Sequence, residues 1–176
     1  MKNKLFWAKA KEDVIIPTKR DEDAGYDIYA NLEEEFVTIK PHETKLIPTR
    51  LHCAFPSGYV LILKERGSTG TKGMGQRAGI VDSGYRGEIF VPITNHNNVS
   101  IIIAKKNVVD IDGGYLFTKG KGMIGTTDDI IYPYEKAICQ AILFEIPQLE
   151  SREIPLDELL AIESERGQGM LGDSGK

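Results

Sequence analysis

Apolar and polar residues alternate in several short runs along this chain. From Ile47 to Phe55 the odd positions carry Ile, Thr, Leu, Cys and Phe, and the even positions carry Pro, Arg, His and Ala. A period of two is typical of a strand with one buried face. Further strand-like runs cover residues 59–63, 89–93, 98–104 and 138–146. Turn signals such as PSG, NHNN and DGG separate these runs, so the pattern predicts many short strands.

Only one segment has helical spacing. In PLDELLAIES at 155–164, Leu156, Leu159 and Leu160 fall on one side of a helix. Short strands at close spacing with so little helix predict an all-β fold, a β-barrel or jelly-roll-like subunit with one short helix near the C-terminus. Pro92, inside a strand-like run, predicts an edge strand or a bulge at that point.

Two segments depart from the strand pattern. Residues 105–133 have weak periodicity and many glycines, which predicts an insertion that contains a hairpin. The last residues, 166–176, are glycine-rich and polar, a composition typical of a disordered end. The length of 176 residues predicts a single β domain over 1–165, followed by this tail.

Composition narrows the possible partners. The net charge of −4 argues against general nucleic-acid binding but permits a small anionic ligand at a local cluster of arginines. Cys53 and Cys139 lie in apolar runs. This position favours small buried hydrophobic residues, with a disulfide as the less favoured alternative. The scattered histidines show no zinc pattern, so no structural metal is expected. No run is apolar enough for a membrane span and the first residues lack signal-peptide character, so we expect a cytoplasmic protein.

Four segments carry candidate chemistry: DAGYDIYA at 23–30, RGSTG at 66–70, GIVDSGYRGEI at 79–89 and RGQGMLGDSG at 166–175. The second can form a backbone nest for an anion, with Arg66 as the counter-charge. Taken singly, each segment also has a plainer interpretation as a turn, a glycine-rich loop, a hairpin or a loose tail.

Taken together, their order and spacing resemble the five motifs of the trimeric dUTP pyrophosphatases (dUTPases). The matching stretches are DAGYD at 23–27, RGS at 66–68, GIVDSGYRGE at 79–88, ICQ at 138–140 and RGQGMLGDSG at 166–175. The first and third match closely, and the others match with changes. The resemblance spans nearly the whole chain.

This resemblance implies a jelly-roll-like subunit in a homotrimer with three shared active sites. It implies hydrolysis of dUTP to dUMP and pyrophosphate with Mg²⁺, which keeps uracil out of DNA and supplies dUMP. The tail at 166–176 is then an arm that closes over the site of a neighbouring subunit.

The resemblance also implies roles for single residues. Asp82 matches the aspartate that activates the attacking water, and Gln140 matches the glutamine that orders water at the α-phosphate. Arg66 and Arg166 match the arginines that bind the triphosphate, for which a planar guanidinium is well suited. Asp27 matches the aspartate that holds Mg²⁺ indirectly, through water.

The base and sugar are expected at the hairpin between Gln76 and Phe90. Tyr85 matches a tyrosine that packs on the deoxyribose and leaves no room for a 2′-hydroxyl. Backbone groups at Gly79, Ile80 and Phe90, with the Gln76 amide, can pair with uracil. The complete set of substrate-binding residues that the resemblance implies is Gly67, Ser68, Gln76, Gly79, Ile80, Val81, Tyr85, Phe90, Arg166, Leu171, Gly172 and Ser174.

Some positions differ from the family pattern. Gly67 stands where the second motif has serine, so Ser68 is expected to supply the hydroxyl from one step along. Leu171 replaces the aromatic residue that stacks on uracil. Asp173 replaces a serine that binds the γ-phosphate, so Ser174 and backbone amides are expected to carry more of that contact.

Two rival functions remain open at this point. A dCTP deaminase shares this motif order but needs a glutamate where this chain has Pro92, which cannot move a proton. A non-catalytic, dUTP-responsive binding protein is the second rival, with residues 105–133 as a surface for a partner.

Overall fold

The structure is a computed structural model that describes residues 4–105, 108–111, 114–117, 123–125, 128–165 and 167–169. The chain divides into two units, Met1–Ile146 and Pro147–Lys176, which are described separately. No helix in the described part of the chain is long and apolar enough to cross a membrane.

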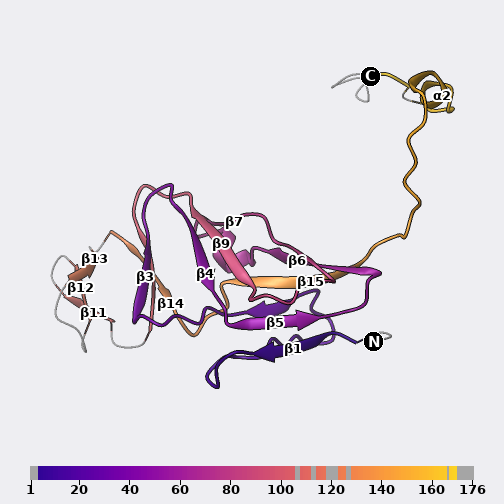
Figure 1. The fold of residues 1–176 in the computed structure, drawn as a ribbon. Coiled ribbons are helices and arrows are strands. Elements are labelled where there is room, and N and C mark those ends of the chain that lie inside the picture. Colours follow the sequence, from indigo (N-terminus) through magenta and orange to yellow (C-terminus); the bar gives the residue numbers. More distant parts are fainter. Residues whose placement is uncertain are drawn as a thin grey trace. The chain divides into compact units, whose positions relative to one another are not determined.

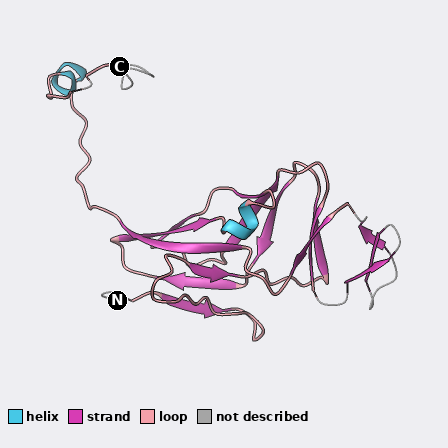
Figure 2. Cartoon of the chain, turned by 180° about the vertical axis from the view of Figure 1, so that it is seen from behind, coloured by secondary structure: helices cyan, strands magenta, loops and turns pink. Residues whose placement is uncertain are grey.

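The first unit is built almost entirely of short strands (Figures 1 and 2). They are β1 (Phe6–Lys9), β2 (Tyr26–Ile28), β3 (Phe36–Ile39), β4 (Thr44–Pro48), β5 (Leu51–Ala54), β6 (Tyr59–Lys64), β7 (Met74–Gln76), β8 (Ile80–Asp82), β9 (Phe90–Asn95), β10 (Ile101–Ala104), β11 (Val108–Ile111), β12 (Gly114–Phe117), β13 (Met123–Gly125), β14 (Ile130–Pro133) and β15 (Cys139–Glu145). One helical turn, α1 (Gly67–Gly70), lies between β6 and β7.

The described strands form five open sheets with the orders β1-β5, β14-β10-β3, β11-β12-β13, β2-β15-β6-β8 and β4-β9-β7. The predicted all-β class is therefore confirmed in its jelly-roll-like form, because no sheet of the described residues closes into a barrel. Within the segment 105–133, strands β11, β12 and β13 pair antiparallel with one another, which is one strand more than a hairpin. The last strand of that segment, β14, instead pairs with β10.

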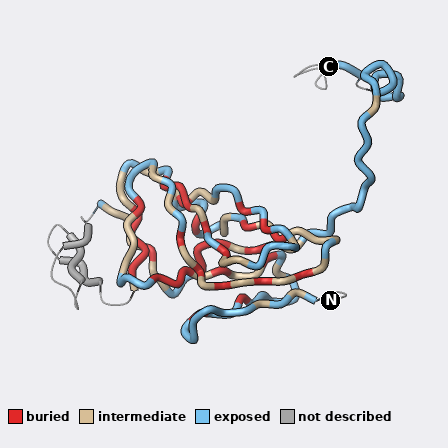
Figure 3. The backbone as a smooth tube through the Cα atoms, viewed as in Figure 1, coloured by how far each residue is buried: buried red, intermediate tan, exposed pale blue. Residues whose placement is uncertain are grey.

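The alternating run from Ile47 to Phe55 buries one face, as predicted. All five odd positions are at most 4% exposed, including Thr49. The Thr49 hydroxyl donates a hydrogen bond to the carbonyl of Ile89, so the buried polar group is satisfied. Each large apolar side chain buried in this way stabilises the fold by about 1.5–3 kcal/mol. Figure 3 shows stretches of buried backbone within the first unit. Cys53 and Cys139 are both buried and unbonded, which confirms their interpretation as small hydrophobes.

The edge prediction for Pro92 is wrong. Its strand, β9, is the middle strand of its sheet and pairs with β4 and β7. The proline is tolerated because β7 ends at Gln76, beside it. The Pro92 carbonyl accepts from the N–H of Arg77, whose own carbonyl accepts from Gln76 Nε2 instead of from a backbone N–H at position 92.

The second unit contains the predicted short helix, α2 (Leu156–Leu160), inside the expected segment 155–164. Leu156, Leu159 and Leu160 are exposed by half or more, so the apolar side of α2 is not covered within the described residues.

Candidate active site

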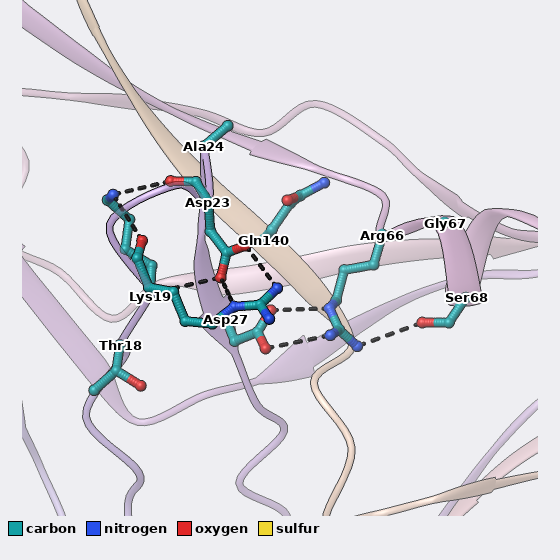
Figure 4. Close-up of a pocket in the computed structure, with 11 residues that line it drawn as sticks. Thr18, Lys19, Asp23, Ala24, Asp27, Arg66, Gly67, Ser68 and Gln140 are labelled. Carbon is teal, nitrogen blue, oxygen red and sulfur yellow. Dashed lines mark hydrogen bonds and ion pairs between the residues drawn. The ribbon is translucent and has the colours of Figure 1, made fainter.

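A cavity of about 730 Å³ gathers the residues of three separate motifs (Figure 4). Its lining comes from the loop and strand at 18–27, from the start of α1 at 66–68, and from Gln140 on β15. This charged cavity therefore contains five of the residues predicted to act together: Asp27, Arg66, Gly67, Ser68 and Gln140.

An ion pair between Asp27 and Arg66 forms the centre of the charged cavity. Arg66 Nε lies 2.9 Å from Asp27 Oδ1, and Arg66 Nη2 donates to Asp27 Oδ2 at 3.3 Å. The third guanidinium nitrogen, Nη1, donates to Ser68 Oγ at 3.4 Å, as Figure 4 shows. Both charged side chains are about one-third exposed, at 32% and 34%. This two-bond ion pair therefore holds the Asp27 carboxylate and the Arg66 guanidinium in fixed positions while leaving both accessible to a ligand.

The local sequence explains why Arg66 is held so firmly. The Thr69 hydroxyl accepts from the Arg66 N–H at 2.9 Å and donates to the Arg66 carbonyl at 3.0 Å. Thr69 is fully buried, so the backbone of Arg66 is fixed against the core by the first residues of α1. The segment RGSTG at 66–70, for which a backbone nest for an anion was one interpretation, forms the helical turn α1.

Gln140 reaches the charged cavity because strands β2 and β15 place it opposite Asp27. Its Nε2 donates to the carbonyl of Glu65 at 2.8 Å, which fixes the carboxamide. A Cβ at Gly25 would lie 2.8 Å from Gln140 Oε1, so only glycine leaves room for this acceptor in the cavity. The glycine of the DAGYD motif is thus required by a side chain 115 residues away.

Lys19 and Arg20 also line the charged cavity, and the sequence interpretation missed them. Lys19 Nζ donates to the carbonyl of Asp23 at 2.9 Å and lies 5.8 Å from the ring centre of Tyr26. Arg20 binds both carboxylate oxygens of Asp23 at 2.9 Å. The hydrogen bonds from Arg20 lower the pKa of Asp23 from 3.8 to about 2. The adjacent basic pair, separated by two residues from the first motif, was the available signal.

A second, smaller pocket of about 240 Å³ lies at the hairpin. Its lining is mostly apolar and contains six of the predicted binding and catalytic residues: Gly79, Ile80, Val81, Asp82, Tyr85 and Phe90. Gly79 has a φ of +102°, and a Cβ there would lie 2.7 Å from the carbonyl oxygen of Leu63. The Leu63 N–H donates to the Gly79 carbonyl at 2.7 Å, so this hairpin pocket is built directly against β6.

Gln76 lies beside the hairpin pocket rather than in its lining. Its Nε2 is 3.4 Å from the position of a Cβ at Gly79 but is already bonded to the Arg77 carbonyl. Its Oε1 is buried and has no hydrogen-bond partner within the described residues. Gln76 thus keeps an unsatisfied carboxamide oxygen in the structure beside the hairpin.

Tyr85 lines the hairpin pocket and is 45% exposed. Its hydroxyl donates to the carbonyl of Glu88 at 2.9 Å. A methyl group at Gly87 would overlap the Tyr85 hydroxyl, so the absence of a side chain at Gly87 leaves room for the Tyr85 ring.

The charged cavity and the hairpin pocket have no lining residue in common. Strand β6 pairs Lys64 with Gln140 at one end and Val60 with Asp82 near the other. At about 3.3 Å per residue, the four-residue offset from Val60 to Lys64 places Asp82 and Gln140 about 13 Å apart along β6. One chain thus keeps Asp82 apart from Arg66 and Gln140. The predicted tail residues Arg166, Leu171, Gly172 and Ser174 lie outside the described residues.

Comparison with known proteins gives consistent relatives. A family model described as dUTPase matches residues 11–109. The deoxyuridine 5′-triphosphate nucleotidohydrolase of Nautilia profundicola is 30% identical over 98% of this chain and 99% of its own length. The Pol polyprotein of caprine arthritis encephalitis virus is 36% identical over 57% of this chain, which spans only 9% of the polyprotein.

Among solved structures, a G164S mutant of the dUTPase of Staphylococcus bacteriophage 80alpha, with dUpNHpp, is similar with a TM-score of 0.74. It is 23% identical, and the match covers 99% of both chains. This similarity supports the jelly-roll-like fold.

Proposed function

The chain belongs to the dUTPase family, and on that basis we propose that it hydrolyses dUTP to dUMP and pyrophosphate, which keeps uracil out of DNA and supplies dUMP. One observation carries the proposal. The predicted residues sort by chemistry into a charged cavity suited to phosphates and a small, mostly apolar hairpin pocket suited to a base and its sugar.

The charged cavity supplies the groups that a triphosphate needs. We assign Arg66 to the phosphate oxygens, and Lys19 and Arg20 are further cations in the lining of the same cavity. Asp27 suits Mg²⁺, because this ion favours one or two carboxylates together with substrate phosphates and water. Within the described residues no group of three acidic, histidine or cysteine side chains gathers, so an all-protein cage is not built there. Bound Mg²⁺ would neutralise charge on the phosphates.

The proposed reaction is an in-line displacement at the α-phosphorus. Asp82 accepts a proton from the attacking water as the bond between its oxygen and the α-phosphorus forms. The bond from the α-phosphorus to the bridging oxygen breaks, and pyrophosphate leaves with that oxygen. The Gln140 carboxamide, fixed by Glu65, orients water at the α-phosphate.

Selection of the base and sugar is assigned to the hairpin pocket. We assign the polar edge of uracil to backbone groups at Gly79, Ile80 and Phe90, together with the Gln76 amide. Nitrogen N3 carries a proton in uracil and none in cytosine, so these groups can distinguish the two bases. A site built on hydrogen bonds can reject the wrong base by about 10⁴–10⁵-fold. The ring of Tyr85 packs on the deoxyribose and excludes a 2′-hydroxyl.

We assign the complete site to a homotrimer. Because Asp82 lies about 13 Å along β6 from the charged cavity, a second copy must bring its hairpin pocket to the cavity of the first. Three large apolar side chains near the hairpin are strongly exposed, Leu46, Ile80 and Phe90, as expected for a surface that a partner covers. The arm at 166–176 closes over the site of a neighbour.

The decisive experiment measures pyrophosphate release from dUTP, dCTP, dTTP and UTP with Mg²⁺. We expect turnover of dUTP alone and a loss of at least about 100-fold in Asp82→Asn. The matched control is Asp157→Asn, which changes an exposed aspartate of α2 and should keep full activity.

Two other outcomes identify the rival functions. Release of ammonia from dCTP would make the protein a deaminase, although Pro92 stands where that reaction needs an acid. Binding of dUTP without turnover by the wild-type chain would make it a dUTP-responsive binding protein.

A further inference from the structure

Arg50 has an unusual backbone for an arginine. It lies directly before β5 with a φ of +56°, in the left-handed region that favours glycine. In the described part of the chain only two other non-glycine residues, His42 and Ala78, have a positive φ. The Nε–H of Arg50 is also buried without a partner within the described residues. Both features are unfavourable, so the other contacts of this side chain must compensate for them.

These contacts join Arg50 to one carboxylate by two routes. Its backbone N–H donates to Glu88 Oε1 at 3.0 Å, and its Nη1 donates to Glu88 Oε2 at 3.1 Å. The Glu88 side chain is only 14% exposed. The remaining nitrogen, Nη2, donates to Glu33 Oε1 at 2.9 Å, where Lys11 also binds. Main chain and side chain of one residue thus hold both oxygens of Glu88, a contact that we call the Arg50–Glu88 clasp.

The clasp holds the end of the hairpin that carries Tyr85. The Tyr85 hydroxyl donates to the backbone carbonyl of Glu88, so the ring takes its position from the backbone at Glu88. The next residue, Ile89, is fixed on both sides, because its carbonyl accepts from Thr49 and its N–H donates to the Leu51 carbonyl at 2.8 Å.

A further contact secures the hairpin from the same strand. His52 Nδ1 lies 3.0 Å from the carbonyl oxygen of Arg86. Residues 49–52 therefore anchor residues 86–89, and Tyr85 is attached to this anchor through Glu88. The contacts of the charged cavity do not involve this segment.

We propose that Arg50 is a positioning residue for sugar selection, which acts through Glu88 to hold the ring of Tyr85 where a 2′-hydroxyl would collide with it. This proposal rests on the proposed function, because the ring has a sugar to select only if a nucleotide occupies the hairpin pocket. Loosening the clasp lets the ring move aside and admits UTP, while the charged cavity keeps its geometry.

The test compares the ratio of kcat/KM for dUTP over that for UTP among folded variants. Arg50→Gly is well suited because glycine favours the left-handed backbone and removes only the side-chain contacts. Glu88→Gln weakens the clasp from the other side. Both variants should lower the ratio by about tenfold, mainly through faster use of UTP. Glu33→Gln, which removes only the outer partner of Arg50, is the control and should stay within about twofold of wild type.

A double-variant measurement separates positioning from general stability. Tyr85→Phe removes the hydroxyl that reaches Glu88, so Tyr85→Phe combined with Glu88→Gln should lower the ratio no further than Tyr85→Phe alone. Independent, multiplying effects would overturn the proposal. It would also be overturned if Arg50→Gly and Glu88→Gln remain folded by thermal melting and keep the wild-type ratio.

Binding measurements keep this test distinct from that of the proposed function. The affinities for dUTP and UTP in EDTA, measured by calorimetry, give a second selectivity ratio, for binding alone and without turnover. A wild-type chain that binds dUTP but does not hydrolyse it contradicts the proposed hydrolysis and still tests the clasp. A wild-type chain with equal affinities for dUTP and UTP overturns the clasp proposal alone.

Discussion

A mixture of two inactive variants tests whether each active site draws on two copies of the chain. Asp82→Asn removes the carboxylate on β8, and Arg66→Gln removes the guanidinium at the start of α1. In one chain these groups belong to separate pockets about 13 Å apart along β6. A complete site therefore takes Asp82 from one copy and Arg66 from another.

The size of the effect follows from counting. In an equal mixture with random assembly, a site has an intact Asp82 in about half of the cases and an intact Arg66 from the other copy in about half. About one quarter of the sites should then be complete, so the mixture should recover about 25% of wild-type activity from two inactive parents.

The assay is pyrophosphate release from dUTP after the two variants are unfolded together and refolded, so that their copies exchange. A second mixture combines wild type with a chain that carries both substitutions. Sites shared between copies predict about one quarter of full activity in this mixture as well, whereas sites contained in one chain predict about one half. The reasoning is refuted if the first mixture stays as inactive as its parents while the second retains half.

Three further predictions concern metal, backbone and charge. EDTA should stop pyrophosphate release and added Mg²⁺ should restore it, because one carboxylate with phosphates is a magnesium site; full turnover in EDTA would contradict this. Gly79→Ala should lower Tm by several degrees, since an alanine there keeps a φ of +102° and puts its Cβ 2.7 Å from the Leu63 carbonyl oxygen. Such strain costs about 1–3 kcal/mol of unfolding free energy, and each kcal/mol lowers Tm by about 2–4 °C. Gly84→Ala, whose Cβ meets nothing within 4 Å, is the control, and equal Tm changes would refute the argument. The Asp23 pKa of about 2 lies below its ordinary value, so the free energy of unfolding of the wild type should fall as the pH drops from about 4 to 2. In Asp23→Asn this fall should be smaller. Parallel curves of unfolding free energy against pH for the two proteins would exclude the argument.

Local rules account for what was predicted correctly about the strands. The residues from Ile47 to Phe55 alternate with a period of two, and the face chosen by that pattern is the buried one. The helix at 156–160 follows from its spacing in the same way. Pro92 was misplaced because the rule that excludes proline from middle strands assumes a neighbour along its whole length. In this sheet β7 ends beside the proline, and no sequence pattern shows where a neighbouring strand stops.

The motif residues could be named from the sequence, but their separation into two pockets could not. The sequence alone indicated the all-β class, the short helix near 156–160, the buried face of the run from Ile47 to Phe55 and the residues with candidate chemistry, because these depend on neighbours a few positions away. Tertiary structure decided that Asp27, Arg66 and Gln140 meet, since strand order and register bring them together across the sheet. It also decided that Asp82, on β8, pairs with Val60 near the other end of β6, and that Arg50 holds Glu88. Such contacts join residues tens of positions apart, and their geometry is fixed by the packing of the whole core rather than by any local preference.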